Sequence, residues 1–580
     1  MKKVTRIGGS LGVLCGVGSV GLAALALAGC GGGDPGPMSG HQALQGRDFA
    51  DVFFWKTRTL AFSRDTADPT QPEPQDLFVW PLDDAAPSLA LGGIDWVFPN
   101  RWPAWLVGDL LLTGTQYERV YDVGNHASAD VFHDFGSWTG GTPDGGAGST
   151  PPLYELLETT TMRSDGLAFA KLIPGSGDGS ADTIVVGRPP ELKAFRVPDG
   201  STVGAISFLG ADLAMLVRQK GADSDVVGVQ RMDTSTGALT QIVAPSAASE
   251  WVGVAGFCED SQAPGTCGFF GTIGCTLDEP ACADGHAPPC QVLYAKADPA
   301  PTATTATVAH AFVHDVTAGT TTQLDGTAPD RFYVDRGHHL FVWGSNSGNF
   351  TKWWNTCTDA RGGCDTWPGP AIAWRPDGGA LAMYGAQQNM RIVNIAEGTC
   401  TGPALEKTYS IYQAQYSSGS DRLWWVAAND TQETSFSMWL ADGNGESPVT
   451  VATGPNLGGT FSWDGQRLYI SHNGESSAAL GWVDVTASPP AETIISSNRG
   501  DVGLLGNSRV LFVDHFNVQD GNGELVFLDL TTGARQSLAR SVTGVSVSDS
   551  SEAEGTDVAY TVRGRAASSR DGLWLTTLPP

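Results

Sequence analysis

The sequence predicts an all-β fold, assembled from small antiparallel sheets that repeat along the chain. One sequence pattern recurs at nearly constant spacing in the second half of the chain. The chain also contains 74 glycines and 34 prolines among its 580 residues. Because both residues disfavour helix interiors and are common in turns, this composition favours short strands joined by tight turns over helical repeats.

The recurring pattern consists of an aromatic residue, a short polar link, an Asp-Gly turn and an alternating apolar strand. It is complete in IAWRPDGGALAMY at 372–384 and nearly complete in FSWDGQRLYI at 461–470. Degenerate copies are QYSSGSDRLWWV at 415–426 and LLGNSRVLFV at 504–513. The aligned landmarks lie 42, 45 and 43 residues apart, at Trp374, Tyr416, Phe461 and Leu504. A period of this size is typical of propellers and of other arrays of small sheets.

The first copy shows why the pattern predicts strands. Pro376 fixes one backbone angle, the Asp377 side chain caps its own backbone, and Gly378 is free to adopt a positive φ. After this turn, Leu381 and Met383 recur at the period of two that is expected for a strand. The unit therefore contains a hairpin.

The pattern around Trp374 and Phe461 resembles the repeats of TolB-type and WD-type β-propellers, which carry an aromatic residue, a P-D-G-like turn and a hydrophobic strand. The resemblance implies four-stranded antiparallel blades around a central channel. Spacing extends the series to as many as eleven units, with landmarks near residues 55, 104, 162, 206, 254, 332, 374, 416, 461, 504 and 547. A single propeller usually has fewer blades, so we expect either one large propeller or two smaller ones. The expected divisions are N-terminal blades over 51–245, a cysteine-rich blade or insertion over 246–331, and C-terminal blades over 332–580.

The N-terminus reads as an export signal. A basic head at Lys2, Lys3 and Arg6 precedes an uncharged stretch of small and apolar residues. The segment LAGC that ends at Cys30 resembles the lipobox of bacterial lipoproteins, which implies a signal peptide over 1–29 and acylation of Cys30. Two or three acyl chains anchor a protein durably. The glycine-rich residues that follow predict a flexible tether over 30–50. In enteric bacteria, an aspartate directly after the acylated cysteine favours retention of a lipoprotein at the inner membrane. Here that position is Gly31, so we expect an outer-membrane anchor, on the periplasmic or cell-surface side.

The charge of the chain argues against nucleic acid as a partner. The sequence has 34 basic and 62 acidic residues, for a net charge of −28. Such a surface repels phosphate backbones. The expected partners are the membrane, through acylated Cys30, and an envelope protein or glycan.

Eight cysteines lie beyond the N-terminal region and are candidates for disulfides in an exported chain: Cys258, Cys267, Cys275, Cys282, Cys290, Cys357, Cys364 and Cys400. Five precede residue 291 and three follow it, so complete pairing requires at least one bond between the groups. Cys357 and Cys364 are close enough to pair locally, which would leave Cys400 as the partner across the gap. A zinc site that includes His286 is a weaker alternative, because paired C-x-x-C spacing is missing.

Two acidic patterns suggest calcium, and both have a simpler interpretation. Asp178, Ser180 and Asp182 begin like a calcium loop, but Thr183 stands where such a loop needs glycine. The sequence DGNGE occurs at 442–446 and again at 520–524, and its Asn-Gly core is equally a preferred hairpin turn. We therefore expect turns, and no cofactor apart from this weak calcium alternative.

Aromatic and histidine residues supply the remaining candidates. Trp424 and Trp425 are expected in the core, because an interior sheet is covered on both faces. Trp353 and Trp354 lie close in sequence to glycines and to Cys357 and Cys364, which indicates a loop. The sequence is therefore compatible either with stacking of these indoles on a ligand or with their burial in the core. His310 and His314 have the spacing of a helical metal site, but AHAFVHDV has the pattern of a strand.

No sequence motif identifies a catalytic residue. The combined features predict a membrane-anchored extracytoplasmic β-propeller lipoprotein that acts as a binding or scaffolding module of the cell envelope. Its ligand is expected at one mouth of the channel. The alternative is an enzyme, either a glycan hydrolase or a lyase, that uses carboxylates carried by loops at the propeller mouth.

Overall fold

The structure is a computed structural model in which β-strands account for nearly all regular structure. It describes residues 38–56, 58–65, 74–95, 105–113, 119–135, 160–163, 165–175, 181–221, 224–248, 271–273, 281–282, 284–285, 290–297, 309–324, 331–335, 339–345, 350–364, 371–384, 390–395, 398–401, 411–473, 478–548, 555–565 and 567–578. Among these residues the helical content is one short helix, α1 (Val131–Phe135). The predicted all-β fold is confirmed.

The chain divides into two compact units that interleave along the sequence. Unit 1 comprises residues 1–102, 417–440 and 448–580, and unit 2 comprises residues 103–416 and 441–447. These units differ from the predicted division into 51–245 and 332–580, because unit 1 combines the two ends of the chain. The predicted signal peptide over 1–29 and the predicted acylation site Cys30 lie outside the described residues.

Unit 2 contains a series of four-stranded antiparallel sheets in which the strands follow chain order. Its sheets are β6 (Trp105–Val107), β7 (Leu110–Thr113), β8 (Arg119–Asp122) and β9 (Ala127–Asp130); β10 (Thr160–Met162), β11 (Phe169–Ile173), β12 (Thr183–Arg188) and β13 (Glu191–Arg196); β14 (Ser201–Leu209), β15 (Asp212–Gln219), β16 (Val226–Met232) and β17 (Leu239–Ala247); β18 (Gly271–Ile273), β19 (Gln291–Ala297), β20 (Ala309–Asp315) and β21 (Thr320–Gln323); β22 (Arg331–Asp335), β23 (Leu340–Ser345), β24 (Phe350–Asn355) and β25 (Arg361–Cys364); and β26 (Ala371–Trp374), β27 (Ala380–Tyr384), β28 (Met390–Asn394) and β29 (Thr399–Thr401). The next sheet in the chain is β30 (Ile411–Tyr416), β31 (Arg422–Ala428), β32 (Phe436–Asp442) and β33 (Val449–Gly454). In that sheet β30 belongs to unit 2, and β31 and β33 belong to unit 1.

The sheets that follow belong to unit 1. Two have four strands: β2 (Phe49–Lys56), β3 (Thr59–Asp65), β4 (Pro74–Pro81) and β5 (Ser88–Asp95); and β34 (Leu457–Phe461), β35 (Arg467–Asn473), β36 (Ala478–Asp484) and β37 (Glu492–Ser496). The last sheet is formed by β38 (Arg499–Leu504), β39 (Arg509–Asn517), β40 (Asn522–Asp529), β41 (Arg535–Val547), β42 (Thr556–Val562), β43 (Gly572–Leu578) and β1 (His41–Gln45).

This seven-stranded sheet fuses two repeats through one long strand. The first part of β41 pairs with β40, and its last part, from Val542, pairs with β42. The predicted landmarks at 504 and 547 therefore fall in one continuous sheet. The four aligned landmarks at Trp374, Tyr416, Phe461 and Leu504 are each the last residue of the first strand of a repeat. The predicted four-stranded antiparallel units are confirmed, and their arrangement around a central channel stays a prediction.

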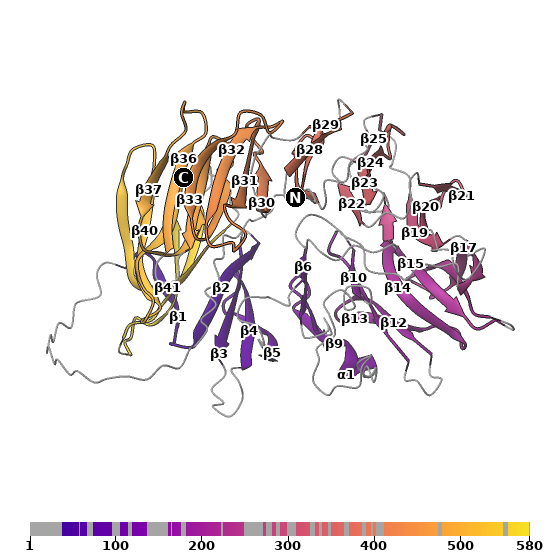
Figure 1. Ribbon diagram of the computed structural model, residues 1–580. Coiled ribbons are helices and arrows are strands. Elements are labelled where there is room, and N and C mark those ends of the chain that lie inside the picture. The colour runs from indigo at the N-terminus through magenta and orange to yellow at the C-terminus, as the bar shows by residue number, and fades with distance from the viewer. Residues whose placement is uncertain are drawn as a thin grey trace, which may run out of the picture. The chain divides into compact units, whose positions relative to one another are not determined.

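The N-terminal strand completes the sheet at the C-terminal end of the chain. β1 pairs antiparallel with β43, with His41 opposite Leu575 and Gln45 opposite Gly572. Residues 41–45, which were expected in a flexible tether, are thus part of a sheet. Figure 1 shows β1 and β2 in indigo beside the C-terminal strand β41. The next sheet, β2–β5, packs on β42 and β43, where Phe62 and Leu573 share one buried cluster.

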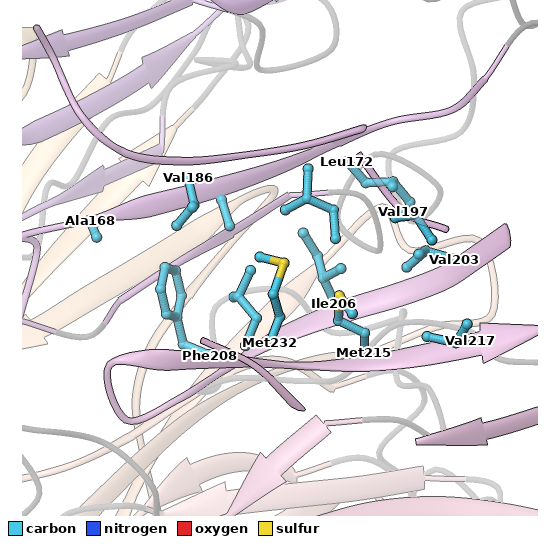
Figure 2. Close-up of a cluster of buried hydrophobic side chains, with 13 residues drawn as sticks. Ala168, Leu172, Val186, Val197, Val203, Ile206, Phe208, Met215, Val217 and Met232 are labelled. Atoms are coloured by element: carbon cyan, nitrogen blue, oxygen red, sulfur yellow. The ribbon is translucent and has the colours of Figure 1, made fainter. Parts of the chain in front are cut away.

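Successive sheets bury their apolar faces against one another. In unit 2, the sheet β10–β13 contributes Leu172 and Val186 to a core that Ile206 and Met215 fill from the sheet β14–β17 (Figure 2). Along each strand, alternate side chains point to opposite faces, so an interior sheet supplies a core on both sides. Each fully buried aliphatic side chain of this kind contributes about 1.5–3 kcal/mol. This packing explains why the strands read as nearly continuous apolar runs.

The same turn geometry recurs at the end of the third strand in several sheets. Asp233, Asp315 and Asp529 each begin a turn in which the carboxylate accepts hydrogen bonds from backbone amides two and three residues later. The turns then close on a glycine with positive φ, which is 75° at Gly237 and 72° at Gly533. Because glycine adopts this conformation at little cost, the sequence D-x-x-x-G marks the hairpin between the third and fourth strands.

These turns predict a defined dependence of stability on acid. The Ser235 hydroxyl and the Ser235 and Thr236 amides lower the pKa of Asp233 to about 2, from a reference value of 3.8. A lowered pKa in the folded state stabilises the fold above the unfolded-state pKa, and this contribution disappears as the pH falls toward 2. We therefore expect Asp233→Asn to destabilise the protein at pH 7 and to have a much smaller effect near pH 2, where half of the folded-state carboxylate is protonated. Urea unfolding at both pH values measures the difference, and an effect of equal size at each would contradict the prediction.

Within the described part of the chain, no helix has the length and the apolar character required to cross a membrane.

Candidate functional site

The candidate site lies on unit 1, where the first strands of three successive repeats are joined side by side. The amide of Val545, on the last part of β41, donates to Asp501 Oδ2 on β38 at 3.3 Å. The amide of Phe54 on β2 donates to Ser546 Oγ, again on β41, at 3.0 Å. We call β38, the last part of β41 and β2 the first-strand row. Side chains from three repeats therefore meet on one continuous surface.

Glycines allow the strands of this row to approach each other closely. A Cβ atom at Gly503 on β38 would lie 2.8 Å from Val547 Cγ1 on β41. A Cβ at Gly500 would lie 2.7 Å from the Phe516 ring. Neither contact is possible for a real side chain without movement of its neighbour. The close spacing of the row thus depends on residues that have no side chain.

A buried arginine lies at the beginning of β38. The side chain of Arg499 is almost fully enclosed, with the residue 5% exposed. Its Nη2 donates to Ser471 Oγ at 2.7 Å and to Asn473 Oδ1 at 3.0 Å. Its Nε donates to the carbonyl of Ala479 at 3.3 Å, and Nη1 donates to the carbonyl of Gly500 at 2.8 Å. The guanidinium of one repeat therefore binds the ends of two strands, β35 and β36, in the preceding repeat.

The electrostatics of Arg499 follow from this burial. Desolvation lowers the pKa of Arg499, and the Asp501 carboxylate on the same strand acts in the opposite direction. Removing a charge from water is costly unless the charge is hydrogen-bonded, and here neutral oxygens accept from each part of the guanidinium. Asp501 itself is exposed. Strand β38 therefore carries an exposed carboxylate, Asp501, two residues after a buried cation, Arg499.

A histidine and a glutamate form a second polar pair in the preceding repeat. His472 Nε2 lies 2.6 Å from Glu492 Oε1, and the side chains are 19% and 14% exposed. The Glu492 side chain crosses β36 at Gly481, where a Cβ would lie only 2.1 Å from Oε1. His472 Nδ1 faces Gly454 on β33, at 3.3 Å from the position of a Cβ. The pair is thus enclosed between two glycines that leave room for it.

A third group of charges surrounds Asp514 on β39, the residue that pairs with Arg499 across the sheet. Its carboxylate accepts from Ser496 Oγ at 2.5 Å and forms an ion pair with Arg535. The adjacent His515 is 75% exposed, and its Nδ1 lies 3.5 Å from Asp514 and 3.6 Å from Glu524. His515 also has a positive φ of 51°, which is uncommon for a residue with a side chain.

Together these groups can hold a polar ligand at a rigid surface. The buried charges are fixed by hydrogen bonds, so little order has to be gained when a ligand binds. The exposed groups are the Asp501 carboxylate and the His515 imidazole. Arg499 lies at the start of β38, and His472 lies near the end of β35, so both lie at the same edge of their sheets. Polar groups held in this way suit recognition of a ligand.

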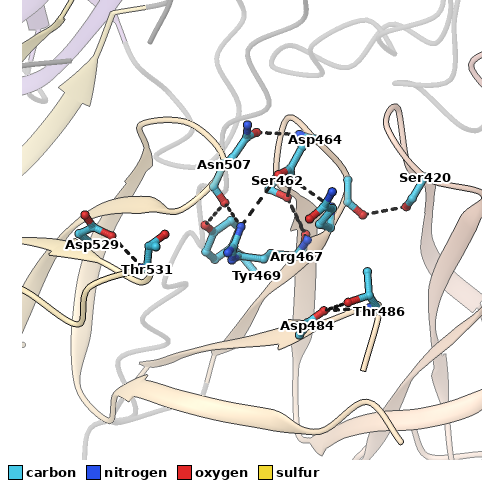
Figure 3. Close-up of polar contacts among 12 residues, drawn as sticks. Ser420, Ser462, Asp464, Arg467, Tyr469, Asp484, Thr486, Asn507, Asp529 and Thr531 are labelled. Carbon is cyan, nitrogen blue, oxygen red and sulfur yellow. Dashed lines mark hydrogen bonds and ion pairs between the residues drawn. The ribbon is translucent and has the colours of Figure 1, made fainter. Parts of the chain in front are cut away.

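The opposite edge of unit 1 carries turns that bind each other (Figure 3). Asp464 in the β34–β35 turn donates its amide to Asn507 Oδ1 in the β38–β39 turn at 2.7 Å. Asn507 also accepts at its carbonyl from Arg467 Nη1 at 3.0 Å. On the other side, Ser420 Oγ donates to the carbonyl of Gly465 at 2.7 Å. Hydrogen bonds thus link Ser420, in the turn before β31, to the β34–β35 turn, and that turn to the β38–β39 turn, which stabilises the relative positions of these turns within unit 1.

The structure corrects the stacking hypothesis for the first tryptophan pair. Trp353 and Trp354 are 4% and 6% exposed, and they lie in two different cores on opposite faces of β24. Arg361 covers the Trp354 ring, with its guanidinium carbon 4.5 Å from the ring centroid. Neither indole therefore offers a face to a ligand. Trp424 and Trp425 are 2% and 0% exposed, in agreement with the core interpretation.

The predicted cysteine connectivity is corrected in part. The structure forms disulfides between Cys282 and Cys357 and between Cys364 and Cys400. The local Cys357–Cys364 bond is therefore wrong, and the bond between the two cysteine groups uses Cys282 rather than Cys400. The physical reason is that β25 pairs with β24 and lies near β29, so Cys364 faces Cys400 in a shared core. Cys290 is also disulfide-bonded. Cys258, Cys267 and Cys275 lie outside the described residues.

The calcium and histidine candidates have structural roles where they are described. Asp182 Oδ1 accepts from the amide of Gly175 at 2.8 Å, and its Oδ2 accepts from the amide of Val203 at 2.7 Å. Asp178 and Ser180 lie outside the described residues, so calcium binding by Asp178, Ser180 and Asp182 stays a prediction. His310 and His314 lie on strand β20, as the pattern predicts, and His314 Nδ1 lies 2.9 Å from Thr321 Oγ1. Burial lowers the pKa of His314.

The two DGNGE sequences both occupy hairpin turns. Asp442 Oδ1 accepts from the amides of Asn444 at 3.1 Å and Glu446 at 2.8 Å, after strand β32. Asp520 lies between β39 and β40, where its Oδ2 accepts from Asn517 Nδ2 at 2.7 Å. These contacts are those expected of turns.

The sequence analysis did not identify the residues of the candidate site. Arg499, Asp501, His472 and Glu492 belong to no motif, and their partners lie in other strands. One signal was present in the sequence: Arg499 is a charged residue at the start of a strand pattern that is otherwise apolar. Burial of such a residue is unusual without hydrogen-bond partners, but the sequence alone does not show the partners.

Comparisons with known proteins give only distant likeness. No protein-family model matches the chain, and the search of curated proteins found no match. Among solved structures, the chain is similar to the tricorn protease, with 12% sequence identity and a TM-score of 0.29 over 91% of this chain. It is also similar to TolB from Acinetobacter baumannii, with 13% identity and a TM-score of 0.22, over 51% of this chain and 84% of TolB. The match covers 57% of the length of the tricorn protease chain.

Proposed function

We propose that this protein is a propeller-type binding or scaffolding module of the cell envelope, anchored to the membrane by acylated Cys30. The observation that carries the proposal is the first-strand row, in which hydrogen bonds join β38 to β41 and β41 to β2. First strands that lie side by side in successive sheets are the arrangement expected around a propeller axis. The sheet completed by β1 and β43 supports the same arrangement, since it joins the two ends of the chain.

The ligand surface follows from the same row. Asp501 is exposed on β38, and His515 is 75% exposed on β39 of the same sheet. The buried Arg499 binds the neighbouring ends of β35 and β36. The chain carries a net charge of −28, so the partner is an envelope protein or glycan that does not depend on phosphate contacts. We place the anchor in the outer membrane, with the folded units on the periplasmic or cell-surface side.

Anchoring is tested by replacing the acylated thiol. Cys30→Ser removes the sulfur that would carry the lipid, because no other side chain at this position forms the thioether. We expect the variant protein to leave the membrane fraction, and its mass to lack the acyl chains. Cys15→Ser, within the same apolar stretch, is the matched control and should fractionate as wild type. Unchanged membrane association of Cys30→Ser would overturn the anchoring proposal.

Ligand binding is tested with the exposed pair. In envelope extracts treated with a crosslinker, wild-type protein should capture a partner that the double variant Asp501→Asn and His515→Ala captures several-fold less well. Asp501→Asn keeps an oxygen acceptor for Val545 while it removes the charge. Asp199→Ala, at a side chain 84% exposed in unit 2, is the control and should capture normally. Equal capture by all variants would exclude Asp501 and His515 from the binding surface.

A further inference from the structure

Two cysteines and one histidine meet in the interior of unit 2. The ligand atoms of Cys282, Cys357 and His339 all lie within 4.8 Å of one another. Cys282 is 4% exposed and His339 is 9% exposed. Across the residues that the structure describes, this is the one place where three histidine, cysteine or acidic side chains come so close together. We call these three residues the Cys2His cluster.

The sheet that contains β23 and β24 fixes two members of the cluster. His339 directly precedes β23, and the amide of Thr356 donates to its carbonyl at 2.9 Å. The next residue, Cys357, donates its amide to Asn355 Oδ1 at 3.0 Å. Since Leu340 and Asn355 are paired across the hairpin, His339 and Cys357 are held together at its end.

The backbone of His339 is strained in a way that supports a specific role. Its φ is 56°, in the left-handed region that residues with side chains rarely adopt. Such strain persists only where the surroundings fix it, and it is concentrated at functional sites. In this conformation a ring nitrogen of His339 lies within 4.8 Å of both sulfurs of the Cys282–Cys357 disulfide.

We propose that the Cys2His cluster is a zinc site in the dithiol form of the protein, and that the disulfide is its closed, metal-free state. Opening the site requires a dithiol reductant. The Sγ–Sγ bond accepts two electrons and two protons and becomes two thiols, while the reductant becomes a disulfide. Zn²⁺ then displaces the two thiol protons to solvent and binds two thiolates and the neutral imidazole.

The chemistry of the three donors favours zinc. Thiolates and imidazole are the ligands of zinc sites, with Zn–S distances of about 2.3 Å. In tetrahedral geometry the two sulfurs, which are bonded to each other in the disulfide, would separate to about 3.8 Å. The His339 ring nitrogen lies within 4.8 Å of both sulfurs. Two thiolates neutralise Zn²⁺, so the occupied site can be buried without net charge. A fourth position would stay open for water or another ligand.

Comparison with the second described disulfide shows that the nearby histidine is what distinguishes the Cys282–Cys357 pair. Cys364 and Cys400 are bonded in unit 2 as well. Their sulfurs belong to an apolar core with Trp353 and Leu381. The disulfide of the Cys2His cluster thus has a third metal ligand within reach, whereas the other serves as a link between two sheets, β22–β25 and β26–β29.

The test compares oxidised and phosphine-reduced full-length protein, with Zn²⁺ alone as the probe. Phosphine takes up the oxygen of water as it reduces the disulfide, and it supplies no thiol that competes for metal. We expect the oxidised protein to bind no zinc that depends on His339, and the reduced protein to bind one such ion. Co²⁺ in place of Zn²⁺ should give thiolate charge-transfer absorption in the reduced protein.

The decisive variant is His339→Gly. Glycine adopts a φ near 56° without strain, so this variant should fold at least as well as wild type. We expect its zinc affinity in the reduced state to fall by about 100-fold, by analogy with the loss caused even by outer partners of metal ligands. His314→Ala removes another buried imidazole in unit 2 and should bind zinc as wild type.

Each outcome decides the proposal. Loss of zinc in His339→Gly, with binding retained in His314→Ala, supports it. Equal zinc binding by wild type and His339→Gly would assign the metal to other cysteines and overturn it. Absence of zinc binding in the reduced wild type would also overturn it, and so would loss of the β-sheet circular dichroism spectrum on reduction.

Discussion

Replacement of Trp425 with alanine is expected to lower the free energy of unfolding by about 3–5 kcal/mol, the range for deletion of a large aromatic side chain from a core. Trp425 lies on β31 and is 0% exposed. Its ring stacks on Trp439 of β32, with centroids 6.4 Å apart and planes 10° from parallel. The alanine variant would lose both the buried area and this aromatic contact, and it would leave a cavity between two covered sheet faces.

Trp425→Phe is the matched control for that prediction. Trp425 Nε1 is buried and has no hydrogen-bond partner among the described residues. Phenylalanine therefore removes an unsatisfied donor together with part of the ring, and the two effects oppose each other. We expect Trp425→Phe to cost well under half as much as Trp425→Ala in urea unfolding followed by circular dichroism. Equal losses for the two variants would show that the stacking and volume arguments are wrong.

The features that the sequence predicted correctly are those that local chemistry determines. Trp374 and Phe461 each close the first strand of a repeat, because an aromatic residue and the Asp-Gly turn after it define a hairpin by themselves. The turn at Asp377 forms as expected: its Oδ1 accepts from the amide of Gly379 at 2.8 Å. The sequence D-x-x-x-G of the third hairpin at Asp233 was equally local, and it could have located further repeats.

The features that the sequence did not predict depend on distant partners. Whether Trp353 and Trp354 face a ligand or a core depends on the sheets that cover β24. Likewise, Cys364 pairs with Cys400 because two sheets are adjacent in space. Arg499 is acceptable in the interior only because strand ends from the preceding repeat supply its acceptors. In each case the deciding contact comes from another repeat, and a single sequence does not specify which repeats adjoin.

The pairing of β1 with β43 is the largest such contact, since it joins the two ends of the chain. Residues 41–45 have no strong strand pattern and follow a glycine-rich stretch, so the sequence favoured a tether. Residues 41–45 form a strand because they pair antiparallel with the edge of β43. An unpaired strand edge is a liability that proteins usually cover, and here the N-terminal residues cover it.

A single carboxylate, Asp571, holds this junction together. It precedes β43 and is 1% exposed. Its side chain accepts from the amides of Gly564 at 3.0 Å and Ser568 at 3.1 Å, and it forms an ion pair with Arg47 Nε at 3.1 Å. Its carbonyl accepts from the amide of Gly46 at 3.0 Å. Asp571 therefore binds both the turn before β43, at Gly564 and Ser568, and the residues directly after β1, Gly46 and Arg47.

Asp571→Ala is expected to destabilise the protein by about 3–5 kcal/mol, because loss of one partner leaves buried polar groups and a cation without compensation. Arg47→Ala should cost much less, since the Arg47 side chain is 36% exposed and water can replace part of its contacts. Hydrogen exchange gives the second measurement: the amides of β1 should lose protection in Asp571→Ala, while those of β35 keep theirs. If β1 stays protected in that variant, pairing with β43 alone orders the N-terminal strand, and the carboxylate only shapes the turn. Loss of protection confined to β1 would instead identify Asp571 as the residue through which the C-terminal sheet holds the segment that follows Cys30.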